Sequence, residues 1–210
     1  MFGPYKAIFQ DGKRTISYIL EHNTDNLLHF LTQSEVEDLR QTFAEENIAR
    51  LTLRRALEIL YGDTNDLIYK EFSMKHFGAW EEIRLTELLG KHVIVTEFPV
   101  LQIPFYHNSK KHDENGVALA ENADLILYGY RETVGSGTRI SDSEILLQKA
   151  KQFNLPEEDY APYLKTRDYE HYQKTSGFGL GWQRLTQWLL KLPVIWEASH
   201  IPRGHYAPRP

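Results

Sequence analysis

The sequence predicts a single α+β domain in which a mostly antiparallel β-sheet is flanked by helices. The length of 210 residues is that of one domain rather than two. A hydrophobic share of 41% and a charged share of 25% are typical of a globular protein with one core. Apolar, β-branched segments follow one another through turns as often as through helices, which favours antiparallel pairing of strands.

The composition excludes several classes of protein. The absence of cysteine rules out disulfides, zinc–thiolate sites, iron–sulfur clusters and thiol catalysis, and it fits a reducing cytoplasm. No apolar run approaches the roughly 20 residues that span a bilayer, and residues 1–6 lack a secretion signal, so no membrane partner is expected. With 24 Lys and Arg against 29 Asp and Glu, the net charge of −5 indicates a poor general binder of phosphate backbones.

The chain begins with a predicted hairpin. Residues 2–30 alternate apolar and polar positions around the turn dipeptide Asp11-Gly12, which predicts two strands. Apolar residues recur at helical spacing in three segments that follow: 33–47, 51–61 and 79–89. Thr52 is the expected N-cap of the second helix, and Gly90 is the expected C-terminal cap of the third.

Strands predominate in the middle of the chain. The β-branched run at 92–98 predicts a buried strand that Pro99 stops. A polar loop is expected over 108–116. Residues 125–128 predict a second buried strand, and residues 132–140 are expected to return beside it. Two further helices are predicted after this sheet: 143–153 and 156–164.

A glycine-rich strand is expected to lead into the last helix. Gly177, Gly179 and Gly181 recur at every second position, so an extended strand has one face without Cβ atoms, on which a flat ring or a ligand backbone can lie. Arg184 follows near the start of the helix, where a cation opposes the helix dipole by ~0.3–1 kcal/mol. A bound anion would relieve this cost. The alternative interpretation is a close strand crossing with an incidental arginine.

A second group of polar residues accompanies the predicted hairpin of residues 125–140. Asp124 and Glu132 place two carboxylates on neighbouring strands, which suits Mg²⁺ bound together with phosphates. Gly135 and Gly137 permit close approach of the backbone to a ligand. Arg139 can hold a carboxylate or an amide through its guanidinium. The alternative is an ordinary hairpin with solvated charges.

Taken together, these segments resemble the catalytic core of class II aminoacyl-tRNA synthetases, in the asparaginyl/aspartyl branch that includes archaeal asparagine synthetase. Residues 177–184 resemble motif 3 of that family, a glycine-rich strand that runs into a helix with a terminal arginine. Three further segments match family phrases in the family's order: 94–99, 124–139 and 200–203. The resemblance therefore extends over residues ~50–205 and implies a class II synthetase-like fold.

The resemblance implies a ligase that uses ATP and Mg²⁺ to activate aspartate or asparagine. Arg184 would contact the γ-phosphate and stack over adenine, and Asp124 and Glu132 would hold ATP through Mg²⁺. Arg139 would recognise the side chain of the amino acid. Four glycines would line the pocket: Gly179 and Gly181 under the nucleotide, and Gly135 and Gly137 at the pocket wall beside the amino acid. On this basis residues 91–140 carry the substrate and ATP strands and residues 176–193 carry motif 3.

The sequence also departs from the family pattern. Gln183 stands where motif 3 has glutamate. Residues 1–30 would be a degenerate motif 2 after the phrase Phe2-Gly3-Pro4, with Lys6 in place of the arginine that meets the α-phosphate. Neither motif 1, which forms the family's dimer interface, nor an anticodon-binding domain is expected in this chain.

These departures leave three functions open within one cytoplasmic, synthetase-like domain over residues 1–210. The first is an adenylate-forming ligase that transfers the amino acid to tRNA. The second is an amide ligase like asparagine synthetase, which does not use tRNA. The third is a non-catalytic paralogue that binds a small molecule or a partner. A homodimer is compatible with each of them, although the motif 1 interface is missing.

Overall fold

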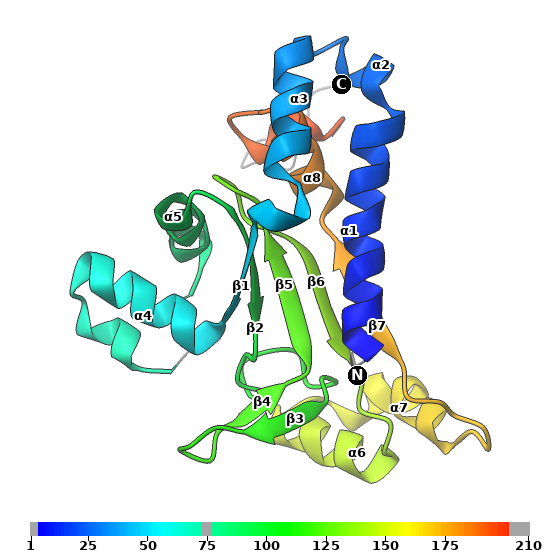
Figure 1. The fold of residues 1–210 in the computed structure, drawn as a ribbon. Helices are drawn as coiled ribbons and strands as arrows, with labels where there is room; N and C mark the ends of the chain where they lie inside the picture. Colours follow the sequence, from blue (N-terminus) through cyan, green and yellow to red (C-terminus); the bar gives the residue numbers. More distant parts are fainter. Residues whose placement is uncertain (1–3, 73–76, 202–210) are drawn as a thin grey trace.

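The computed structural model describes residues 4–72 and 77–201 (Figure 1). Its α-helices are α1 Pro4–His22, α2 Thr24–Leu27, α3 Gln33–Thr42, α4 Leu53–Thr64, α5 Ala79–Leu89, α6 Ser143–Gln152, α7 Glu157–Lys165 and α8 Trp182–Leu189. Its strands are β1 Ile48–Thr52, β2 His92–Thr96, β3 Ser109–His112, β4 Ala118–Ala120, β5 Asn122–Ile126, β6 Glu132–Thr138 and β7 Ser176–Leu180. Short 3₁₀ helices are η1 Glu45–Asn47, η2 Leu67–Lys70, η4 Thr166–Asp168 and η5 Ile195–Ala198.

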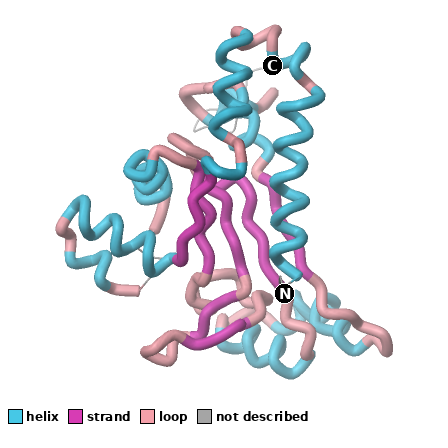
Figure 2. Tube along the Cα trace, viewed as in Figure 1, coloured by secondary structure: helices cyan, strands magenta, loops and turns pink. Residues whose placement is uncertain are grey.

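A five-stranded sheet in the order β1-β2-β5-β6-β7 forms the centre of the molecule. Strands β1 and β2 run parallel, and every other neighbouring pair in this sheet is antiparallel. Figure 2 shows the strands side by side with helices around them. The predicted architecture, a mostly antiparallel sheet flanked by helices, is confirmed.

The two faces of the sheet are covered by different helices. Ile94, Leu125 and Val134 face α1, α3 and α8, and together with the apolar sides of these helices they form one core cluster. Val95 and Ile126 point the opposite way and pack with residues of α4 and α5. This alternation follows from the pleat, which sends successive side chains of a strand to opposite faces. The candidate site lies beyond the second cluster, on the α4–α5 face.

Local signals place the helix ends as expected. The Oγ1 of Thr52 accepts a hydrogen bond of 3.2 Å from the backbone N–H of Arg55, so Thr52 is the N-cap of α4. Gly90 ends α5 with φ of 62°, a left-handed conformation that favours glycine. The predicted strand over 92–98 is β2, and the predicted return strand over 132–140 is β6.

The hairpin predicted over residues 2–30 is wrong, because the described part of this segment forms the 19-residue helix α1 followed by α2. Phe9, Ile16 and Leu20 are buried on one side of α1, at intervals of seven and four residues. Gly12, which predicted a turn, lies inside the helix instead. A Cβ there would come within 2.9 Å of Val134 Cγ1, so the glycine lets α1 lie close against the sheet.

Two strand regions were missed from sequence. The parallel edge strand β1 precedes α4, and β3 pairs with β4 in a small second sheet where a polar loop was expected over 108–116. The side chains of β3 are exposed, so its sequence lacks the apolar alternation that indicates a strand. None of the described helices is long and apolar enough to cross a membrane.

Candidate active site

A cavity of about 640 Å³ opens over the middle of β5, β6 and β7. Its volume is within the range of about 300–1,000 Å³ of small-molecule sites. Seven residues predicted for the site line it: Asp124, Glu132, Gly135, Arg139, Gly179, Gly181 and Arg184. Residues up to sixty positions apart in the chain are therefore brought together by the register of three strands.

Paired glycines lie under this cavity and under the side chains at its edge: Gly135 and Gly179 line it, whereas Gly137 and Gly177 are covered by His107 and Arg139. In the β6–β7 register, Gly135 lies opposite Gly179, and Gly137 lies opposite Gly177. Paired residues of antiparallel strands share a face, so four positions on the α4–α5 face carry no side chain. The predicted strand face without Cβ atoms is thus confirmed and is two strands wide.

Charged side chains occupy the space that these glycines leave. A Cβ on Gly135 would overlap the Oε1 of Glu132 and lie 3.6 Å from the Oδ1 of Asp124. Both carboxylates therefore approach the same point above Gly135. A Cβ on Gly177 would lie 3.0 Å from the Nη2 of Arg139, so the guanidinium of Arg139 is also laid over the floor.

Asp124 and Glu132 form a strained carboxylate pair. Burial of Asp124, followed by repulsion from Glu132 and Glu82, raises the pKa of the Asp124 carboxyl well above its ordinary value. A divalent cation between the two would relieve this repulsion, and carboxylate oxygens are the ligands that Mg²⁺ prefers. The described residues contain no group of three or more potential metal ligands, so phosphate and water would complete the coordination shell. The residues present fit Mg²⁺ bound together with a nucleotide.

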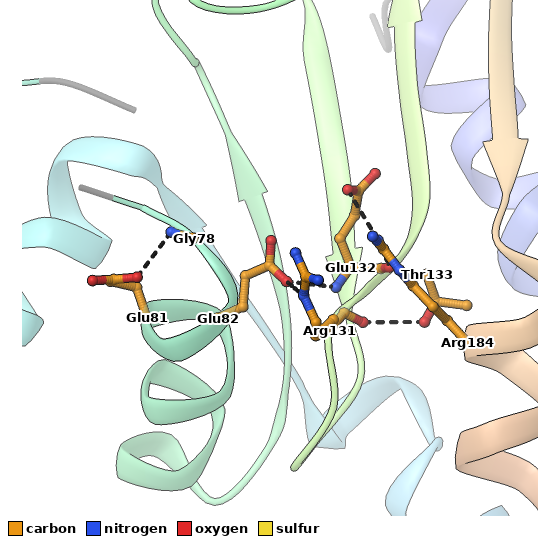
Figure 3. Close-up of polar contacts among 7 residues, drawn as sticks. All are labelled: Gly78, Glu81, Glu82, Arg131, Glu132, Thr133 and Arg184. Atoms are coloured by element: carbon orange, nitrogen blue, oxygen red, sulfur yellow. Dashed lines mark hydrogen bonds and ion pairs between the residues drawn. The ribbon is translucent and has the colours of Figure 1, made fainter. Parts of the chain in front are cut away.

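Arg184 reaches across from the first turn of α8 to Glu132, as Figure 3 shows. Its Nη1 donates to the backbone oxygen of Glu132 and lies 3.4 Å from the Glu132 carboxylate. An internal carboxylate thus takes the place of the anion expected at this helix start.

Glu82 of α5 supports Glu132 from the other side (Figure 3). Its Oε2 accepts a hydrogen bond of 3.1 Å from the backbone N–H of Glu132 and lies 3.3 Å from Nε of Arg131. Sequence reasoning missed Glu82, because its only local signal is an acidic residue in the first turn of a helix, where acids are common.

His107 is a second residue that sequence reasoning missed. In the structure it lines the cavity, and its Nε2 lies 3.2 Å from Nη1 of Arg139. The contact comes from an isolated β-bridge between His107 and Arg139, outside the named strands, which no local pattern indicates.

Lys6 is not brought together with the other predicted residues. It lies on α1 and lines a separate cavity of about 280 Å³ with Thr96 and Ala123. Ala123 belongs to the core cluster under α1, so the sheet separates Lys6 from Asp124. Lys6 lies in a helix, whereas the sequence predicted a strand for this segment. Phe2 and Gly3 of the predicted motif 2 phrase, and Pro202 and Arg203 of the final phrase, lie outside the described residues.

The fold and the cavity define the class of protein. An antiparallel sheet with a glycine floor, a carboxylate pair and two arginines has the layout implied by the resemblance to class II synthetases. The family model of the class II tRNA synthetases (D, K and N) matches residues 4–205. The chain belongs to this family.

Individual relatives point to its asparaginyl members. The chain is 34% identical over 174 residues to an asparagine–tRNA ligase of Thermus thermophilus, a match that covers 80% of this chain and 38% of the relative. The crystal structure of asparaginyl-tRNA synthetase from Pyrococcus horikoshii matches with a TM-score of 0.77 and 27% identity, over 97% of this chain and 47% of that one. The same synthetase complexed with asparaginyl-adenylate gives a TM-score of 0.75 at 26% identity, over 97% and 45%. The chain thus spans less than half the length of these relatives.

Proposed function

We propose that the cavity binds ATP together with asparagine or aspartate, and that the chain activates the amino acid as an aminoacyl-adenylate. The observation that carries the proposal is one cavity that combines a floor without Cβ atoms, two carboxylates and two arginines. The floor can accept flat rings at close range, and the charges match a triphosphate with its cation. The relative solved with asparaginyl-adenylate supports this choice of ligand.

In the proposed reaction, an oxygen of the amino-acid carboxylate attacks the α-phosphorus of ATP. The bond from that phosphorus to the bridging oxygen breaks, and pyrophosphate leaves. Such a step needs alignment and charge neutralisation more than a nucleophilic side chain. Bound Mg²⁺, held by Asp124 and Glu132, would supply part of that neutralisation. Arg184 would release Glu132 and bind the γ-phosphate end of ATP instead. Arg139 would bind the side chain of the amino acid.

Replacement of Arg184 tests the nucleotide part of the proposal. We expect Arg184→Ala to weaken Mg²⁺–ATP binding by about 10- to 100-fold, the value of one or two hydrogen bonds to a charged group. Isothermal titration calorimetry measures the affinity. Arg14→Ala is the matched control, because Arg14 lies on α1 with its side chain 82% exposed. Equal affinities of the Arg184 variant and the wild type would refute the assignment.

Amino-acid-dependent exchange of pyrophosphate into ATP tests the chemistry. We expect exchange with asparagine or aspartate and none with leucine. A second candidate function, binding of these ligands without activation, is favoured by the position of Lys6 behind the sheet and by the exposed Gln183. Calorimetric binding without exchange would select this second candidate.

The acceptor of the activated amino acid decides between the remaining alternatives. Transfer to tRNA, as in the asparagine–tRNA ligases named above, is the acceptor that we propose, with protein synthesis in the cytoplasm as its setting. Formation of free asparagine from aspartate and ammonia would instead identify an amide ligase. Adding tRNA or ammonia to the exchange assay separates the two, and light scattering at the same concentration shows whether the active species is a dimer.

A further inference from the structure

The guanidinium of Arg139 is held on two sides within the cavity. Its Cζ lies 4.5 Å from the centroid of the Tyr106 ring, and Nη2 lies over the bare backbone of Gly177. Within residues 4–72 and 77–201, no carboxylate comes within the 4.0 Å of an ion pair with Arg139. The charge of Arg139 is therefore available to a ligand, except where Nη1 meets His107.

His107 meets Arg139 as a hydrogen-bond acceptor. Its Nδ1 lies 3.0 Å from the carbonyl oxygen of Pro104, which can only accept, so Nδ1 carries the proton. The lone pair of Nε2 then accepts from Nη1 of Arg139 at 3.2 Å. Burial, and to a lesser extent the charge of Arg139, lower the pKa of His107 to about 4. The imidazole is therefore neutral at pH 7.

The floor fixes the imidazole in this position. A Cβ on Gly137 would overlap Cδ2 of His107 and come within 2.6 Å of Nε2. A backbone bridge joins His107 to Arg139, so ring and guanidinium are held by the same pairing. The contact thus depends on glycine at position 137.

We infer that His107 is a specificity-determining residue, which occupies one outer nitrogen of Arg139 and thereby favours an amide side chain over a carboxylate. The inference rests on the proposed function of the cavity. A carboxylate gains most from a guanidinium when both outer nitrogens donate to its two oxygens. An amide has one acceptor oxygen, which Nη2 alone satisfies. With an N–H of Nη1 directed to the imidazole, a carboxylate that approaches the Nη1–Nη2 end of the guanidinium is left with Nη2 as its donor, whereas the amide oxygen of asparagine needs no second donor.

The test compares the affinities for asparagine and aspartate in the full chain, measured by calorimetry with a non-hydrolysable ATP analogue and Mg²⁺. We expect the wild type to bind asparagine at least tenfold more tightly. His107→Leu frees Nη1, so aspartate gains a bond and the preference falls at least fivefold. His107→Gln restores an acceptor oxygen and with it most of the preference. His112→Leu, at an exposed histidine of β3, is the control and keeps the wild-type ratio.

Each outcome decides the matter. An unchanged ratio in His107→Leu, or a wild type that prefers aspartate, overturns the inference and leaves the proposed function in place. Binding of neither amino acid by the wild type overturns both. If His107→Leu does not fold, Gly137→Ser tests the same contact, because its side chain displaces the imidazole of His107. We expect this variant also to lower the preference for asparagine. An unchanged preference in Gly137→Ser overturns the inference as well.

Discussion

The negative charge of Asp124 lowers the stability of the ligand-free protein but is needed for the proposed binding of Mg²⁺. Its carboxyl is partly buried beside Glu132 and Glu82, so its pKa is raised in the folded protein. As pH rises above the ordinary value of 3.8 through the raised one, the folded state must accept an unfavourable charge, and the free energy of unfolding falls. A residue that weakens the empty protein in this way is typical of functional sites.

We therefore expect Asp124→Asn to stabilise the protein by about 1 kcal/mol at pH 7 without ligand, because the repulsion is removed while the shape is kept. The same change should abolish the thermal shift produced by Mg²⁺–ATP, since one of the two metal ligands loses its charge. Thermal unfolding with and without Mg²⁺–ATP measures both effects. Asp38→Asn, at an exposed position of α3, is the control for loss of a negative charge. A destabilised variant that still responds to Mg²⁺–ATP would contradict both expectations.

Two glycines that lie inside helices, Gly12 and Gly62, differ in the space around them. Gly12 is buried where α1 meets the sheet, and a Cβ there would lie 2.9 Å from Cγ1 of Val134, a stiff side chain. Gly62 is exposed on α4, and a Cβ there would contact nothing within 4 Å. Gly12 is therefore required for the close packing of α1, whereas packing does not require glycine at position 62.

We expect Gly62→Leu to raise the free energy of unfolding by about 0.5–1 kcal/mol through helix propensity alone. Gly12→Leu should lower it by about 1–3 kcal/mol, because the added side chain forces α1 away from β6. Urea denaturation of the two variants side by side gives both values. Stabilisation by Gly12→Leu would show that α1 does not lie against the sheet as closely as described.

Helices and strands whose own residues show a clear pattern could be predicted from the sequence. Features that depend on contacts with distant segments could not. The run at 92–98 and the glycine-rich strand before Arg184 are strands because of their own composition, and both were predicted. The alternation of apolar residues at the start of α1 was taken for a strand, although burial follows the helical positions Phe9, Ile16 and Leu20. In the site, the glycines, carboxylates and arginines were found from their spacing, and the family resemblance supplied their expected roles. His107 was not, since only the folded register brings it to Arg139.

The stability of the whole molecule should depend on pH through its buried histidines. Burial lowers the pKa of His92 and of His107 to about 4, against an ordinary value of 6.5. Between these values the unfolded chain binds protons that the folded chain does not, so the free energy of unfolding decreases as pH falls from 6.5 to 4. The loss amounts to about 3 kcal/mol at most for each histidine.

A substitution at His92 isolates one of the two contributions. Its Nδ1 accepts a hydrogen bond of 2.8 Å from the backbone N–H of Tyr128, and glutamine can supply an acceptor without titrating. We expect His92→Gln to reduce the loss of stability between pH 7 and pH 5, measured by urea denaturation at each pH. His29→Gln, at an exposed histidine, should leave the pH dependence unchanged. The same pH dependence in both variants would exclude His92 as its source.

The close packing of α1 against β6 and β7 also determines when the protein can fold during its synthesis. The helix leaves the ribosome before the sheet, because Val134 and Phe178, which would touch a Cβ on Gly12, are made much later. Until then, Phe9, Ile16 and Leu20 have no sheet to cover them. Contacts between segments so distant in the chain form slowly, and uncovered apolar surface promotes aggregation. The nascent chain therefore exposes the apolar side of α1 until the glycine-rich strand has emerged, and its core closes only then.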